Sequence, residues 1–68
     1  MKELLINGRT MEVAAEVETV KQLMEHLDLK SPIIIVEHNE EVLQKPDHEL
    51  VKVQAGDTIE FVQFVGGG

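Results

Sequence analysis

Three glycines close the chain, and they are the residues best suited to chemistry. Gly66, Gly67 and Gly68 directly follow Phe64-Val65, the end of a Val/Phe-rich run that is typical of a strand. Because glycine has no Cβ, a carboxylate at Gly68 would stand on a thin, flexible stalk that can enter another protein's active site. The sequence therefore predicts a carrier whose working group is the Gly68 carboxylate, with Gly66 and Gly67 giving partners access to it. The alternatives are a plain flexible end and glycines left by cloning.

The remaining residues form no recognisable catalytic set. The chain has no Cys, which excludes disulfides, thiolate metal sites and a cysteine nucleophile. His26, His38 and His48 are widely spaced, which favours surface histidines over metal ligands. The sequence shows no Ser-His-Asp set and no phosphate-binding loop, and the neighbouring acids Glu40 and Glu41 fall in a polar turn. We therefore expect no enzyme activity of its own, no bound cofactor and no metal.

The charge balance limits the partners of such a carrier. Thirteen acidic residues accompany six basic ones, which gives a formal net charge of −7 in 68 residues. Nucleic-acid binding needs clustered Lys and Arg, so we expect no DNA or RNA partner. A partner with a basic docking face is favoured, because electrostatic attraction speeds their encounter. The acidic residues that could form a docking face are Glu37, Glu40, Glu41, Asp47, Glu49, Asp57 and Glu60. For any one of them, a simply solvated surface position is the more common case.

Two local signals define the first half of the domain that must hold the tail. Asn7-Gly8, between Lys2–Ile6 and Arg9–Val13, indicates a hairpin with a type I′ turn. Thr19 and Gln22 form a capping box that opens a helix, which should end near residues 27–30 because Pro32 follows. The apolar stripe of this helix consists of Val20, Leu23, Met24 and Leu27.

The second half of the sequence predicts several short strands. Ile33–Val36 is a continuous β-branched run, which predicts a central strand covered on both faces. Val42-Leu43 can add a brief strand, and the alternation in residues 51–54 predicts another after an irregular segment. Residues 58–65 form the last strand after a turn at residues 55–57.

Alternation along the last strand separates its side chains into two sets. Ile59 and Phe61 fall on the core face, whereas Val62 and Phe64 fall on the opposite face. Exposed apolar side chains beside a reactive tail are suited to anchor a partner, so the predicted partner interface is Val62, Phe64 and Val65. The alternative is a bulge or twist that turns Val62 and Phe64 inward.

A hairpin, a helix and further strands in this order predict an α+β fold of the β-grasp type, a roll in which a mixed four- to five-stranded sheet packs on one helix. Residues 1–65 form this domain, and residues 66–68 form a flexible glycine tail. The apolar stretches are too short for a signal peptide or a membrane span, which predicts a cytoplasmic protein without membrane contact.

Several segments together resemble ThiS-type sulfur carriers, the small ubiquitin-like proteins of thiamine biosynthesis. The segments are Ile6-Asn7-Gly8, Val36-Glu37-His38-Asn39, Ala55-Gly56-Asp57-Thr58-Ile59-Glu60 and the final Gly67-Gly68. The resemblance spans the whole chain. The small subunit of molybdopterin synthase is similar in fold and tail, but Phe61–Val65 lacks the Phe-Pro-Pro-Val stretch common in that subunit. Carriers that serve tRNA thiolation share the tail chemistry and remain an alternative.

The resemblance implies a mechanism for the tail. An E1-like, ThiF-type enzyme would use ATP and Mg²⁺ to adenylate the Gly68 carboxylate. A sulfur-donor enzyme would then leave a thiocarboxylate, which supplies sulfur to a ThiG-type thiazole synthase. The chemistry agrees, because an α-carboxylate is ionised at neutral pH and becomes a good acyl acceptor only after activation. Two other readings stay open: a ubiquitin-like modifier that is joined to a lysine, and a passive β-grasp interaction module.

Overall fold

The computed structural model describes residues 1–64. The elements in chain order are β1 (Lys2–Ile6), β2 (Arg9–Val13), α1 (Val20–His26), β3 (Ile33–His38), β4 (Glu41–Leu43), the 3₁₀ helix η1 (Lys45–Glu49) and β5 (Thr58–Phe64). Four residues singled out by the sequence lie outside the described residues: Val65 of the predicted interface, and Gly66, Gly67 and Gly68 of the predicted tail. Within residues 1–64, no helix combines the length and the apolar character needed to cross a membrane.

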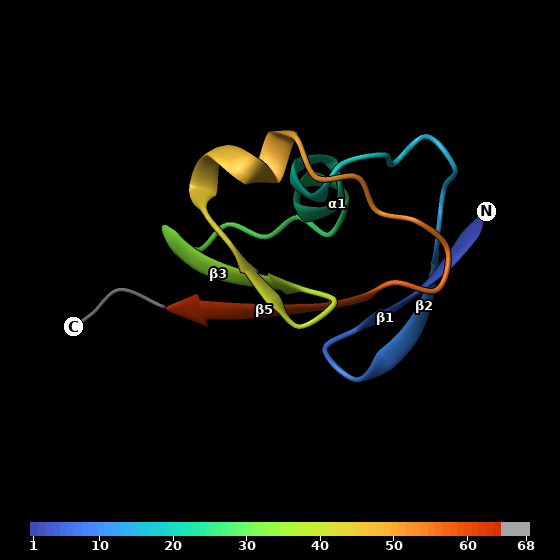
Figure 1. Ribbon diagram of the computed structural model, residues 1–68, viewed down its shortest axis with the longest axis horizontal. Helices are drawn as coiled ribbons and strands as arrows, with labels where there is room; N and C mark the ends of the chain where they lie inside the picture. Colours follow the sequence, from blue (N-terminus) through green and yellow to red (C-terminus); the bar gives the residue numbers. More distant parts are fainter. Residues whose placement is uncertain (65–68) are drawn as a thin grey trace.

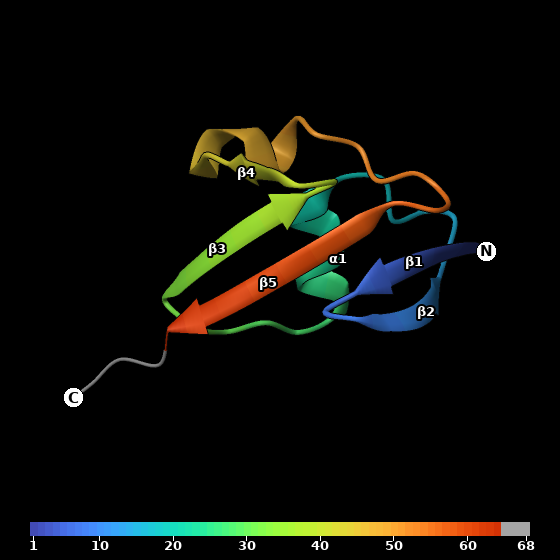
Figure 2. The ribbon, with the colours of Figure 1, turned by 60° about the horizontal axis from the view of Figure 1, so that its bottom comes forward.

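The strands form one mixed five-stranded sheet in the order β2-β1-β5-β3-β4. The central pair, β1 and β5, is parallel, and the other three pairs are antiparallel. Helix α1 packs on a single face of this sheet; Figure 1 shows it on one side, and Figure 2 shows it behind the strands. This is the β-grasp arrangement that the sequence predicts. We call the sheet face turned away from α1 the outer face.

Two local predictions are confirmed by the backbone. Asn7 and Gly8 have φ angles of 50° and 80°, as both central residues of a type I′ turn require, and they join strands paired from Ile6–Arg9 onward. At the start of α1, the Thr19 hydroxyl accepts a hydrogen bond from the Gln22 backbone N–H (3.1 Å), and the Gln22 side chain accepts one from the Thr19 N–H (3.0 Å). The capping box therefore forms in both directions.

The core lies between α1 and the sheet face that it covers. A helix of one to two turns is unstable by itself, so burial of its apolar side stabilises α1. Val20 and Leu23 are fully buried, whereas Met24 and Leu27 of the same stripe are partly buried at its margin. The buried apolar residues are Leu4, Ile6, Val13, Val17, Val20, Leu23, Val36, Val53, Ile59 and Phe61.

The prediction that Ile33–Val36 is covered on both faces is wrong. β3 does lie inside the sheet, between β5 and β4. However, Ile33 and Ile35 are 59% and 42% exposed, because they point to the outer face and α1 covers only the other one. The β-branched run therefore reflects an interior strand with an apolar outer side, and not a strand between two layers.

The strand predicted over residues 51–54 is also absent from the described sheet. Its backbone pairs with the chain that enters α1: the Val53 N–H donates to the Glu18 carbonyl (2.8 Å), and the Val20 N–H donates to the Val51 carbonyl (3.0 Å). Val53 is nevertheless buried, so the alternation reports burial correctly but not sheet pairing. The segment before it, predicted to be irregular, forms η1, which has Pro46 in its first turn.

Candidate functional site

The outer face carries an apolar patch at the end where β5 finishes. Val62 and Phe64 are 50% and 49% exposed, so the predicted alternation is confirmed and they do not turn inward. Phe64 lies opposite Ile33 on the neighbouring strand, and Val62 lies opposite Ile35. Side chains directly opposite each other share one face of a sheet. We call five neighbouring exposed apolar residues of β5, β3 and β4 on this face the outer patch; they are Ile33, Ile35, Val42, Val62 and Phe64.

Sequence reasoning found only the β5 members of this patch. Ile33, Ile35 and Val42 were missed because pairing between strands distant in sequence cannot be deduced from alternation within one strand. One signal was available: a single short helix cannot cover both faces of a five-stranded sheet, so a continuous β-branched run in an interior strand must expose half of its side chains. The patch lies across β5, β3 and β4, which are neighbours in the sheet and are labelled in Figure 2.

Two pairs of acidic residues also lie on the outer face. Glu37 and Glu60 lie directly opposite each other on β3 and β5, next to the patch, and Glu3 and Glu12 form a second opposed pair on β1 and β2. Like charges at such positions destabilise a sheet. The strand positions that point to this face include no Lys or Arg. The face therefore suits a partner that presents an apolar surface flanked by basic side chains.

The predicted acidic docking face is corrected in part. Glu37 and Glu60 belong to the outer face, but Glu49 lies at η1, where its carboxylate pairs with Lys21 of α1 at 3.0 Å. Asp57 is largely buried and bonded within the protein. The acids are thus divided among the outer face, the η1 region and an internal hydrogen-bond cluster.

That cluster joins the β3–β4 turn to the turn before β5. The Asp57 carboxylate lies 2.7 Å from His38 Nε2, and it accepts hydrogen bonds from the Gln54 backbone N–H (2.9 Å) and the Asn39 side chain (3.3 Å). The Asn39 side-chain oxygen in turn accepts from the Thr58 N–H at 2.8 Å. These contacts hold the beginning of β5 in place.

The environment of Asp57 affects its protonation. Burial by itself raises the pKa of the carboxyl, but the hydrogen bonds from Gln54, His38 and Asn39 outweigh it, and the pKa of Asp57 lies below its ordinary value. The carboxylate therefore remains ionised in the folded protein at neutral pH.

Asn7, at the end of β1, holds the middle of β5 on the edge that faces β1. Its backbone N–H donates to the Ile59 carbonyl at 3.0 Å, and its side-chain oxygen accepts from the Phe61 N–H at 2.7 Å. The last backbone pair between β1 and β5 is Ile6–Ile59, so the Asn7 side chain acts in place of the next residue of β1. Asn7 is therefore both a turn residue and a support for the strand that leads to the predicted tail.

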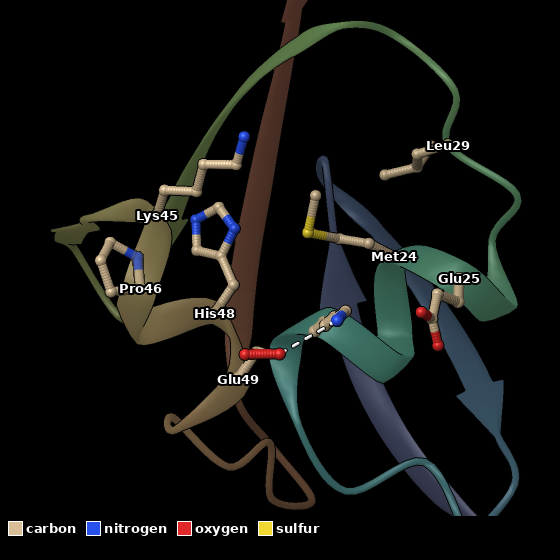
Figure 3. A pocket seen from close by; sticks show the side chains of 8 residues that line it. Met24, Glu25, Leu29, Lys45, Pro46, His48 and Glu49 are labelled. Carbon is tan, nitrogen blue, oxygen red and sulfur yellow. Dashed lines mark hydrogen bonds and ion pairs between the residues drawn. The ribbon is translucent and has the colours of Figure 1, made fainter.

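A pocket lies away from this face, between α1 and η1. It is an open groove of about 640 Å³, and a second one of about 580 Å³ adjoins it and shares Met24, Leu29, Lys45 and His48. Figure 3 shows the His48 ring between Lys45 and Met24. His48 is only 9% exposed and its Nε2 has no hydrogen-bond partner, so the prediction of a surface histidine is wrong here.

The other two histidines differ from each other. His26 is exposed as predicted, whereas His38 is largely buried against Asp57. Within residues 1–64, no three side chains of His, Asp or Glu lie together in a way that could hold a metal ion. The outer face is therefore the candidate site: an apolar patch with an acidic border, placed where the chain leaves β5 toward Gly66–Gly68.

The chain is similar to a known protein family and to solved structures. The model of the ThiS family matches residues 4–68. The crystal structure of the thiamine biosynthesis protein (ThiS) from Geobacter metallireducens is similar with 32% identity and a TM-score of 0.82, over 97% of this chain and 99% of that one. The NMR solution structure of a thiamine biosynthesis protein from the same organism gives 32% identity and a TM-score of 0.80, over 97% and 87% of the two chains.

A longer protein also contains a similar segment. A thiazole synthase of Paramagnetospirillum magneticum is 38% identical over 66 residues, which is 97% of this chain and 20% of that protein. The chain thus spans about a fifth of the length of this relative.

Proposed function

This chain belongs to the ThiS family, and from that membership we propose that it is a sulfur carrier of thiamine biosynthesis with its sulfur attached at the carboxylate of Gly68. One observation supports this most: the family match includes the glycines that follow β5, and β5 ends within an apolar patch suited to a partner. In this proposal the protein serves as a co-substrate of its partner enzymes, which carry out the catalysis.

The proposed chemistry has two steps, both carried out in partner active sites. An oxygen of the Gly68 carboxylate attacks the α-phosphorus of ATP, pyrophosphate leaves, and an acyl-adenylate forms. The partner, an adenylating enzyme of the E1-like type, supplies the ATP site and the Mg²⁺ that offsets phosphate charge. Sulfide-level sulfur, supplied as HS⁻ by a donor enzyme, then attacks the acyl carbon, AMP leaves with the electrons of the broken C–O bond, and loss of the sulfur-bound proton produces a thiocarboxylate. Gly66 and Gly67 allow the carbonyl carbon to enter a narrow channel.

The outer patch has a separate role in this proposal. Each residue ordered in a partner channel costs about 1–2 kcal/mol of backbone entropy, and contacts elsewhere must offset it. Val62 and Phe64, with Ile33, Ile35 and Val42, supply apolar area for docking next to the tail. Val65 belongs to the same proposed interface. The acidic border accelerates encounter with a basic partner.

We further propose that the sulfur goes to a thiazole synthase. The similarity of this chain to a segment of a protein named thiazole synthase supports that acceptor, since a carrier and its acceptor work in physical contact.

The decisive experiment measures the intact mass of the protein after incubation with ATP, Mg²⁺, a sulfur source and an extract that charges a known carrier. Replacement of one oxygen by sulfur is expected in the full chain and not in a variant that lacks Gly68. An unchanged mass in a competent extract would overturn the carrier function. Covalent attachment to lysines of other proteins would instead indicate a ubiquitin-like modifier.

A further inference from the structure

β5 lies inside the sheet, but its last residues have no strand paired with them on the side of β1. On one side it pairs with β3 along its whole length, up to the pair Ile33–Phe64. On the other side it pairs with β1 only at Leu5–Thr58 and Ile6–Ile59, because β1 ends there in the Asn7-Gly8 turn. The last residues of β5 therefore have a neighbouring strand on one side only, as can be followed in Figure 2.

The hydrogen bonds identify which groups lie on this edge. The carbonyls of Asp57 and Ile59 accept from Leu5 and Asn7, and the Phe61 N–H donates to the Asn7 side chain, so these β5 residues face β1. Backbone groups of a strand alternate in direction with a period of two. The carbonyl of Phe61 and both the N–H and the carbonyl of Gln63 consequently face the same side, past the point where β1 ends.

We propose that an extended segment of the adenylating partner pairs with this edge as an additional strand, forming backbone hydrogen bonds to Phe61 and Gln63. This inference rests on the proposed carrier function, because it assigns the partner of that same site. Gln63 is close in sequence to the residues that the partner must hold, and addition to an existing strand supplies affinity through main-chain groups. β3 already keeps this part of β5 extended, so little ordering remains to be done.

Charge indicates the chemistry of the added segment. The outer-face side chain between Phe61 and Gln63 is Val62, and the acidic pair Glu37–Glu60 lies next to it. A segment that carries apolar residues together with Lys or Arg on this face complements both features. A second copy of the chain is disfavoured as occupant, because each copy has a net charge of −7 and would bring further acids to the same face.

The test changes one backbone atom. In a chain made by chemical synthesis, an α-hydroxy acid with the Gln63 side chain replaces the residue 63 N–H by an ester oxygen, which leaves every side chain unchanged. The matched control is the same replacement at Glu12. The backbone groups of Leu5 and Glu3 face β5, so the backbone groups of their partners on β2, Thr10 and Glu12, point away from β1 at the outer rim of the sheet. Both chains retain all their described internal hydrogen bonds, and equal unfolding curves confirm this.

The readout is the rate of charging of Gly68 by the adenylating partner at limiting protein concentration. The chain with the ester at 63 should be charged about three to ten times more slowly than the unmodified chain, as expected for one lost hydrogen bond. The chain with the ester at 12 should be charged normally. Equal rates in all three chains would overturn the proposal and leave the carrier function intact. Failure to charge even the unmodified chain would overturn the carrier function itself.

Hydrogen exchange of the Gln63 amide gives a second, independent readout. It should be fast in the isolated protein and slow in the complex with the partner, whereas the Glu12 amide should exchange equally in both. Unchanged fast exchange of Gln63 in a saturated complex would overturn the strand addition. Protection that appears with rising concentration of the isolated protein would assign the edge to a second copy instead.

Discussion

The imidazole Nε2 of His38 and the carboxylate of Asp57 lie 2.7 Å apart, in contact across two turns that are distant in sequence. Each is only 15% exposed. With Asn39 they tie the β3–β4 turn to the first residue of β5. The strand that leads to the proposed reactive tail is therefore anchored at its beginning by polar contacts, in its middle by Asn7, and along one side by β3.

Loss of the Asp57 carboxylate should destabilise the fold. Asp57→Ala leaves the Gln54 N–H and the His38 ring without their acceptor, so we expect a decrease of about 1–3 kcal/mol in the free energy of unfolding. Urea denaturation at pH 7 measures it. The exposed acid Glu16 provides the control, since Glu16→Ala should change the unfolding free energy by less than about 0.5 kcal/mol.

The same carboxylate makes stability depend on pH in the acid range. Because the folded pKa of Asp57 is lowered, its contribution is fully present above the unfolded value of about 3.9 and is lost as the pH falls through the lower folded pKa. The difference in unfolding free energy between the natural chain and Asp57→Asn should therefore shrink below about pH 4. A difference that stays constant down to pH 2 would contradict the assignment.

Phe64→Ala should weaken partner docking without weakening the fold. The side chain is half exposed on the outer patch, so its loss removes contact area for the partner and little from the core. We expect at least about a tenfold rise in the partner concentration that gives half-maximal charging, with an unchanged thermal midpoint. Leu50, a more exposed apolar residue beyond η1, is the matched control. An equal effect of Leu50→Ala would show that the outer patch has no special role.

Glu60→Gln should change stability and partner association in opposite directions. It removes the charge repulsion between residue 60 and the opposite Glu37, which should raise the free energy of unfolding by about 0.2–1 kcal/mol. It should also slow association with a basic partner, most strongly at low ionic strength. Stopped-flow association over a salt series, combined with denaturation, measures both effects. Glu12→Gln relieves the second acidic pair far from the patch, and it should stabilise the protein with a smaller effect on association.

His48→Phe should stabilise the protein. The buried Nε2 has no partner, so its removal relieves a desolvation cost of about 1–3 kcal/mol, while a ring is kept between α1 and η1. We expect a gain of about 1 kcal/mol in chemical denaturation. His26→Phe, at an exposed position of α1, should give no comparable gain. A less stable His48→Phe protein would indicate that the imidazole has a hydrogen bond in solution.

Local patterns in this sequence predict local structure well. The Asn7-Gly8 turn and the Thr19–Gln22 capping box depend on residues adjacent in the chain, and both form as expected. Alternation likewise places Val62 and Phe64 on the exposed side of β5, because a strand has a fixed period of two.

The errors concern features that depend on neighbours distant in sequence. Residues 51–54 have the alternation of a strand, but the chain available for pairing is the entry to α1. His48 looks like a polar surface residue until η1 folds against α1. The extension of the patch to β3 and β4 follows from strand register, which a single sequence does not encode locally.

The parallel pairing of β1 with β5 also bears on how the protein reaches its folded state. These strands come from nearly opposite ends of the chain, yet they occupy the centre of the sheet. Contacts of such long sequence separation form late and make folding slow, because a large loop must close first. β5 is therefore held by both its neighbours only after the whole segment between β1 and β5 has closed into a loop. A partner that requires this strand in place would therefore recognise the folded domain and not the unfolded chain.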